Sequence, residues 1–183
     1  MSTTDEQTVS STTASVTARA GYMMGEAVEQ SWSPDDALAW EGLLEVSRRL
    51  RRGAEALLEE RHELSVSMLA IMGRLAAAPC STLHQTDVAD AMGLSLSRIS
   101  RLIDTLEARE FVRRHPCPAD ARATNIELTP TGAERTAQSQ ETIRSYVQTR
   151  FVEQLSADER ATLAAVFSRL LGDRHGADAG SCC

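Results

Sequence analysis

Short hydroxyl and guanidinium side chains recur in the segment SLSRISRLIDTLEAREFVRR, residues 95–114. Read as a helix, the segment places its apolar residues at i, i+3, i+4 and i+7, so they must face the body of the protein: Ile99, Leu102, Ile103 and Leu106. The side chains left on the outer side are Ser97, Ser100, Arg101 and Thr105, with Arg98 at the margin. Hydroxyls of this kind donate hydrogen bonds to phosphate oxygens, and arginine forks match guanine edges. Taken alone, an ordinary amphipathic helix explains the segment equally well.

The neighbouring elements make the segment more specific. Gln85 to Met92 predicts a helix of about two turns, which Gly93 ends in a left-handed conformation. Ser95 can then cap the second helix. Residues 111–114 predict a short strand, HPCPADAR a loop, and residues 123–128 a return strand. Two helices around a glycine turn followed by a hairpin form a winged helix-turn-helix, a device that puts one helix into the DNA major groove.

Helical periodicity extends to both sides of this lobe. Ser33, Pro34 and two aspartates predict the start of a helix over residues 34–61, and a second helix follows over about 65–77. Thr129-Pro130 begins a helix to about residue 152, and SADE at 156–159 begins a last helix to about 173. The expected fold is mainly α with a small β-wing. We expect residues 1–32 to be a disordered tail and residues 175–183 to be a flexible one.

The charge distribution allows a nucleic-acid partner despite an acidic total. The formal net charge of the 183 residues is −7. Residues 95–114 nevertheless carry five arginines against three acids, a local balance of +2. A mildly basic face on an acidic body predicts salt-sensitive DNA binding that is weak away from its target.

Several classes of protein are disfavoured. No apolar run reaches the roughly 18 residues that span a membrane, and no secretory signal is visible, so we expect a cytoplasmic protein. The four cysteines show neither metal-ligand spacing nor a dense disulfide framework, which fits a reducing compartment: Cys80, Cys117, Cys182 and Cys183. No nucleophile–base pair or phosphate loop appears, so we expect no enzyme, no metal and no cofactor. The alternative function is a winged-helix module for protein–protein interaction, with weak or no DNA binding.

The motifs MGLSLSRISRLIDTLEAREFVRR, PADAR and IELTPTG resemble the MarR (multiple antibiotic resistance regulator) family of transcription regulators, over roughly residues 35–172. The resemblance implies a homodimer on double-stranded DNA with an inverted-repeat operator. It also implies a DNA-binding lobe at about 65–128 between dimerisation helices at 34–61 and 130–173, and a repressor released by a small aromatic ligand or by oxidation. The expected DNA contacts are Ser95, Ser97, Arg98, Ser100, Arg101, Thr105, Arg113, Arg114, Asp120 and Arg122.

The wing departs from the family pattern Asp-x-x-Asp-Arg-Arg. Asp120 and Arg122 match it, whereas Cys117 and Ala121 do not, so one arginine contact is missing. We expect Cys117 to be exposed among basic neighbours, where it would be either an unimportant loop residue or a redox-sensitive thiol. The candidates for a ligand site are Trp40, His62, Met68, Met72 and Arg74, each of which packing or a surface position also explains.

Overall fold

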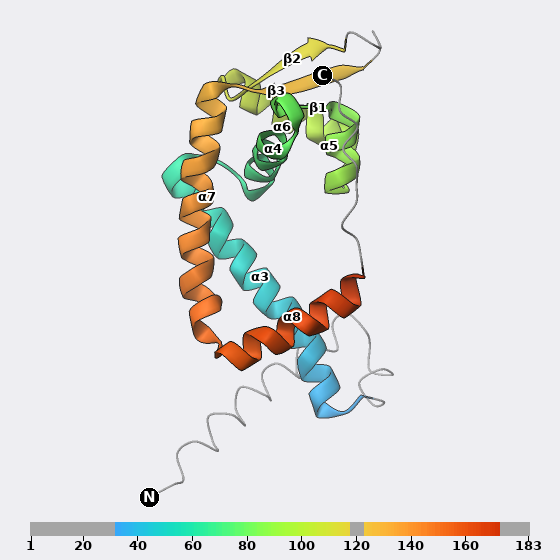
Figure 1. Cartoon of the computed structure of the whole chain (residues 1–183), viewed down its shortest axis with the longest axis vertical. Coiled ribbons are helices and arrows are strands. Elements are labelled where there is room, and N and C mark those ends of the chain that lie inside the picture. The colour runs from blue at the N-terminus through green and yellow to red at the C-terminus, as the bar shows by residue number, and fades with distance from the viewer. Residues whose placement is uncertain (1–31, 118–122, 173–183) are drawn as a thin grey trace, which may run out of the picture. The chain divides into compact units, whose positions relative to one another are not determined.

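Helices and one small sheet make up the computed structural model, which describes residues 32–117 and 123–172 (Figure 1). The helices are α3 (Pro34–His62), α4 (Val66–Ala77), α5 (Gln85–Met92), α6 (Leu96–Ala108), α7 (Pro130–Arg150) and α8 (Ala157–Leu171). The strands are β1 (Thr82–His84), β2 (Val112–Pro116) and β3 (Thr124–Leu128), and short 3₁₀ turns cover Pro79–Ser81 and Val152–Gln154. The predicted fold class, mainly α with a β-wing, is confirmed. The two predicted tails lie almost wholly outside the described residues.

Contacts divide the chain into two compact units within α3, after Gly53. The described part of the first unit is the start of α3, which opens with a reciprocal cap as the sequence predicts. Ser33 Oγ accepts the backbone N–H of Asp36 at 3.2 Å, and Asp36 Oδ2 accepts that of Ser33 at 3.2 Å. Further along the helix, Glu45 accepts hydrogen bonds from Arg48 and Arg49, and these lower the pKa of its carboxyl group.

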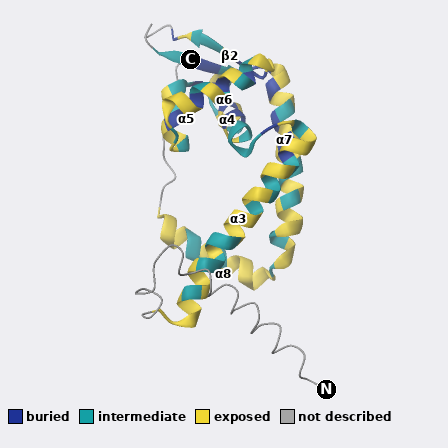
Figure 2. Cartoon of the chain, turned by 180° about the vertical axis from the view of Figure 1, so that it is seen from behind, coloured by how far each residue is buried: buried dark blue, intermediate teal, exposed yellow. Residues whose placement is uncertain are grey.

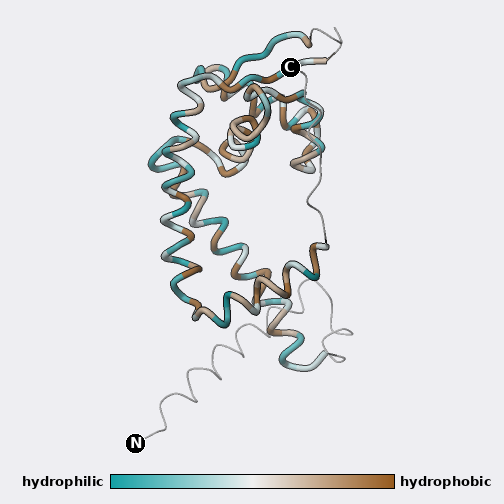
Figure 3. Tube along the Cα trace, viewed as in Figure 1, coloured by the Kyte–Doolittle hydropathy of each residue, from teal (hydrophilic) through white to brown (hydrophobic). Residues whose placement is uncertain are grey.

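The second unit holds the hydrophobic core. Figure 2 shows the buried residues gathered around α4, α6 and the sheet, and Figure 3 places apolar segments on the same helices. The buried cluster comprises Leu64, Ile71, Met72, Leu75, Leu83, Val88, Ala89, Ile99, Ile103, Leu106, Phe111, Val112, Ile126 and Leu128. The predicted apolar stripe of the second motif helix is therefore the side that packs inward, which leaves the opposite side of α6 exposed.

The sheet has one strand more than the sequence predicts. Its order is β1-β3-β2, with both pairs antiparallel. Leu83 of β1 and Arg114 of β2 both lie opposite Ile126 of β3. Because residues directly opposite in a sheet project from the same face, Arg114 projects from the face that carries the core residues Leu83 and Ile126. β1 has three residues, too few to show an alternation in the sequence.

The TPTG motif, residues 129–132, forms the start of α7, and contacts there explain its threonine and its glycine. Thr129 Oγ1 accepts the backbone N–H of Gly132 at 2.9 Å and donates to the carbonyl of Glu110 at 2.7 Å. A Cβ atom on Gly132 would lie 2.0 Å from the carbonyl oxygen of Phe111. Glycine is therefore required there, because any side chain would collide with the backbone that enters β2.

The predicted helix boundaries are confirmed at other positions. Gly93 ends α5 with φ of 61°, the left-handed conformation that glycine adopts without strain. The capping box predicted at SADE is present, with Ser156 and Glu159 bonded to each other's backbone N–H. None of the helices in the described ranges is long and apolar enough to cross a bilayer.

Candidate nucleic-acid interface

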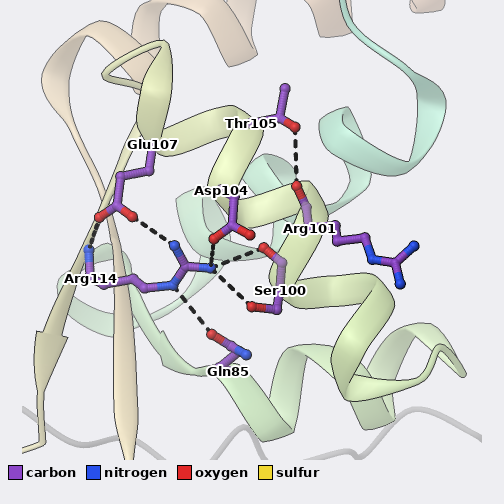
Figure 4. Close-up of polar contacts among 7 residues, drawn as sticks. All are labelled: Gln85, Ser100, Arg101, Asp104, Thr105, Glu107 and Arg114. Carbon is purple, nitrogen blue, oxygen red and sulfur yellow. Dashed lines mark hydrogen bonds and ion pairs between the residues drawn. The ribbon is translucent and has the colours of Figure 1, made fainter.

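The exposed side of α6 is the centre of the candidate site. The side-chain oxygen of Ser95 accepts the backbone N–H of Arg98 at 3.4 Å and so caps the helix. Ile99, Ile103 and Leu106 are fully buried beneath it. Ser97, Arg98 and Arg101 are exposed, as predicted. Figure 4 shows the Arg101 side chain extending away from the polar cluster on the other flank of the helix.

Charge is distributed unevenly along α6. Its first two turns carry Arg98 and Arg101, and its first turn contains no acidic residue. The acids Asp104 and Glu107 follow in the second half of the helix. The positive end of the helix dipole thus coincides with the arginines, and both favour an anion such as a phosphate group at the first turns.

Arg114 joins the wing to α6 and α5 (Figure 4). Its guanidinium lies 2.7 Å from Asp104 Oδ1 and 2.6 Å from Glu107 Oε2. It also donates to the carbonyl oxygen of Ser100 at 3.0 Å and to Gln85 Oε1 at 3.4 Å. We call these five residues the Arg114 clamp. The Arg114 clamp fixes strand β2 to α5 and α6, because the Arg114 side chain contacts both helices of the helix-turn-helix.

The clamp alters the expected role of two predicted DNA contacts. The Arg114 side chain is 21% exposed and its guanidinium is already bound by two carboxylates. Ser100 is half-buried and is held through its backbone carbonyl by the same guanidinium. These contacts hold both residues at the edge of the exposed face of α6, and their contacts with DNA stay predictions. Thr105 is half-buried as well, and its hydroxyl donates to the carbonyl of Arg101 at 3.0 Å within the helix.

The wing is described up to its tip. Arg113 is exposed, on the face of β2 opposite to Arg114. Asp120 and Arg122 lie outside the described residues, so their predicted DNA contacts stay predictions. The expectation that Cys117 is exposed is wrong, because its side chain is 3% exposed. Its backbone N–H donates to the carbonyl of Ala123 at 3.0 Å, which continues the hairpin beyond the last paired residues of β2 and β3. Reactive thiolates need access to solvent, so burial removes the basis for redox sensing at Cys117.

The five candidates for a ligand site are divided between the two units, and their role in ligand binding stays a prediction. Met72 is fully buried in the core, and Met68 packs against that core. Arg74 is exposed and donates to the carbonyl of Ala91 at 2.9 Å. His62 lies beside α7, and Trp40 belongs to the other unit. Packing or local hydrogen bonding accounts for Met68, Met72 and Arg74.

His62 is the candidate with the most unusual surroundings. Its Nε2 lies 2.8 Å from Thr142 Oγ1, and its Nδ1 is buried without a hydrogen-bond partner among the described residues. Burial lowers the pKa of His62 from its ordinary 6.5, and the positive charges of Arg135 and Arg61 lower it further. The neutral imidazole is the favoured form. In the described ranges, no group of three or more His, Cys, Asp or Glu residues could hold a metal ion.

Sequence reasoning missed the partners of Arg114 and the exposure of Leu96. Asp104 and Glu107 are spaced i, i+3 and share one helix face, a signal that could have predicted an acidic pair for a nearby cation. Leu96 lies one turn before Ile99 and so continues the apolar stripe, yet it is 48% exposed. Nothing in the sequence distinguishes it from a core residue.

Comparison with known proteins identifies the same lobe. Residues 62–123 match the MarR family. The chain is 24% identical over 109 residues to the multiple antibiotic resistance protein MarR of Salmonella typhimurium, covering 60% of this chain and 74% of that protein.

Solved structures share the fold over most of the chain. AbsC, a MarR family transcriptional regulator from Streptomyces coelicolor, superposes with a TM-score of 0.70 at 25% identity, covering 76% of this chain and 94% of AbsC. The DNA complex of MepR from S. aureus gives a TM-score of 0.63 at 26% identity, covering 70% of this chain and 93% of MepR. The winged helix-turn-helix segment of this chain thus matches the MarR family, and its fold is that of solved MarR family transcriptional regulators.

Proposed function

We propose that the protein is a homodimeric, sequence-specific DNA-binding regulator that represses transcription. One observation carries the proposal: α6 presents Ser97, Arg98 and Arg101 to solvent on a helix whose other side is fixed in the core. A helix held in this way can enter the major groove without rearrangement. Hydroxyls and arginines are the side chains that bond to phosphates and to guanine edges there.

Charge and relatives support DNA as the partner. The local balance of +2 over residues 95–114 contrasts with the total of −7. MepR, which is 26% identical, has been solved bound to DNA. Repression follows most simply, since a dimer that occupies a promoter blocks it without further contacts. A small aromatic effector is the ligand class that the family resemblance implies for its release.

Exposed apolar side chains support a dimer. On α3, Trp40, Leu43 and Val46 are 36%, 41% and 46% exposed. On α8, no residue is buried, and Leu170 and Leu171 are 69% and 63% exposed. Large apolar groups on two successive turns of a helix are typical of a protein interface. A second copy of the chain, which brings the same helices, is the occupant that the proposal assigns to them.

The dimer is tested by light scattering on a size-exclusion column. The wild type should elute with twice the mass of the chain. Leu43→Glu and Leu170→Glu should raise the dissociation constant, because each places a charge in an apolar interface. Arg52→Glu, which adds negative charge at an exposed position of α3, is the matched control and should leave the mass unchanged. A wild-type monomer at micromolar concentration would contradict the dimer.

DNA binding is tested by selection from randomised duplexes, followed by fluorescence anisotropy on the selected site. The site should be an inverted repeat whose half-site centres are about ten base pairs apart. Arg98→Ala and Arg101→Ala should each weaken binding by about 1–3 kcal/mol if the arginine contacts a base. If the arginine contacts a phosphate instead, the slope of the logarithm of the binding constant against the logarithm of the salt concentration should decrease in magnitude by about one. Arg169→Ala on α8 is the control for loss of one positive charge. The alternative, a protein–protein interaction module, would be favoured by two results together. The selection would enrich no DNA site, and a protein partner would bind the wild type, Arg98→Ala and Arg101→Ala equally well.

A further inference from the structure

Leu96 is the apolar exception on the exposed part of the winged lobe. It is 48% exposed, and within the described residues from 54 to 128 it is the one large hydrophobic side chain with substantial exposure. It occupies the first position of α6, between Ser95 and Ser97. Its neighbours on the helix are therefore the groups to which DNA binding is attributed above.

The fold itself does not require a leucine at this position. The hydrophobic contact that often fixes the start of a helix joins the residue before the cap to the fourth helical residue, and Leu94 and Ile99 occupy those positions. Ile99 is fully buried and Leu94 packs against the core, whereas Leu96 does not belong to that cluster. Ser95 already satisfies the helix N-terminus. A polar side chain at residue 96 would thus serve the fold equally well.

We propose that Leu96 recognises the 5-methyl group of a thymine in each half of the operator. The proposal rests on the DNA-binding function inferred above and makes Leu96 a specificity-determining residue. The methyl group of thymine is the one apolar group that bases present in the major groove. In helix-turn-helix proteins, the N-terminal residues of the recognition helix contact the base edges, and Leu96 is the first of them.

The surroundings of Leu96 favour DNA over an apolar protein surface. Ser97, Arg98 and Arg101 lie exposed within the next turns, and burying them against an apolar surface would leave their donors without acceptors. DNA supplies phosphate and base acceptors for these groups and a methyl group for Leu96. The first turn of α6 also lacks an acid that would repel the phosphates.

Uracil substitution tests the contact, because uracil in place of thymine removes the methyl group alone. Each thymine of the selected site is replaced in turn, and dissociation constants are measured for the wild type and for Leu96→Ala. At one thymine per half-site, uracil should weaken wild-type binding about fourfold, since burial of one methylene-sized group contributes about 0.8 kcal/mol. Leu96→Ala should bind thymine and uracil sites within twofold of each other.

Two further variants separate this contact from a general loss of binding. Leu96→Met keeps an apolar side chain and should retain the discrimination against uracil. Ser97→Ala should bind more weakly yet discriminate like the wild type. A uracil penalty that is absent at every thymine, or equal in the wild type and in Leu96→Ala, would overturn the assignment. A selection that enriches no site would instead refute DNA binding itself, and the inference with it.

Discussion

The Arg114 clamp leads to a quantitative prediction for Arg114→Met. The substitution keeps most of the aliphatic stem and removes the guanidinium. It therefore abolishes the ion pairs to Asp104 and Glu107, at 2.7 and 2.6 Å, and the hydrogen bond to the Ser100 carbonyl at 3.0 Å. Strand β2 would keep the hydrogen bond from the backbone N–H of residue 114 to Glu107 Oε1 at 2.9 Å, but it would lose the side-chain bonds to α6.

The size of the effect follows from the exposure of each partner. The side chain of Asp104 is 61% exposed, so water screens that pair and it contributes at most about 1 kcal/mol. The Arg114 and Glu107 side chains are 21% and 40% exposed, which places their charge-assisted bond near the low end of the usual range, at about 1.5 kcal/mol. With a smaller contribution from the Ser100 carbonyl, Arg114→Met should lower the free energy of unfolding by roughly 2–3 kcal/mol.

Urea unfolding followed by circular dichroism measures this loss. Arg113→Met is the matched control, because Arg113 is exposed on the same strand, and it should change the free energy of unfolding by less than about 0.5 kcal/mol. Combining Arg114→Met with Glu107→Gln should give less than the sum of the two single losses, since the residues are in contact. Equal effects of the two arginine variants, or strict additivity in the double variant, would refute the clamp.

Three further substitutions test other parts of the structure. Gly132→Ala should destabilise the protein by about 3 kcal/mol or prevent folding, because its Cβ would lie 2.0 Å from a backbone oxygen. Gly42→Ala is the control: no atom lies within 4 Å of the added Cβ, so this variant should be neutral or stabilising in thermal melts. The lowered pKa of His62 means that the unfolded state binds a proton first as pH falls below about 6.5. Stability in urea should therefore decrease from about pH 7.5 to about pH 5.5, and less so in His62→Gln; an equal decrease in the two proteins would contradict the burial of a neutral imidazole. Ser95→Ala should cost about 1 kcal/mol through loss of the α6 cap, whereas Ser97→Ala should not.

The sequence predicts those features that local chemistry determines. Gly93 and Ser95 fix the turn and the start of α6 by their own backbone and side-chain preferences, so the boundaries of the helix-turn-helix follow directly from the residues. The TPTG motif predicts the start of α7, although the reason for Gly132 is a contact with Phe111, far away in the chain. The conformational preference of a residue can be predicted from its type alone. A close contact between two distant backbone segments cannot, because it depends on the tertiary fold.

The features that depend on distant partners were not predicted. β1 exists because Thr82–His84 pairs with β3, and a three-residue strand has no pattern of its own. The sequence predicts Arg114 as a DNA contact, yet its guanidinium pairs with Asp104 and Glu107 of α6. The position of Cys117 in the loop sequence predicts an exposed thiol, but the hairpin continues to Ala123 and Cys117 is 3% exposed. In each case tertiary pairing decides the exposure of a side chain.

Methylation interference on the selected DNA tests the central claim most directly. Dimethyl sulfate methylates guanine at N7, an acceptor that lies in the major groove. If the exposed face of α6 enters that groove, methylation of specific guanines in both half-sites should block binding by the wild type. Arg101→Ala should relieve the interference at those guanines it contacts. Binding that tolerates N7 methylation at every guanine would contradict the placement of α6 in the major groove.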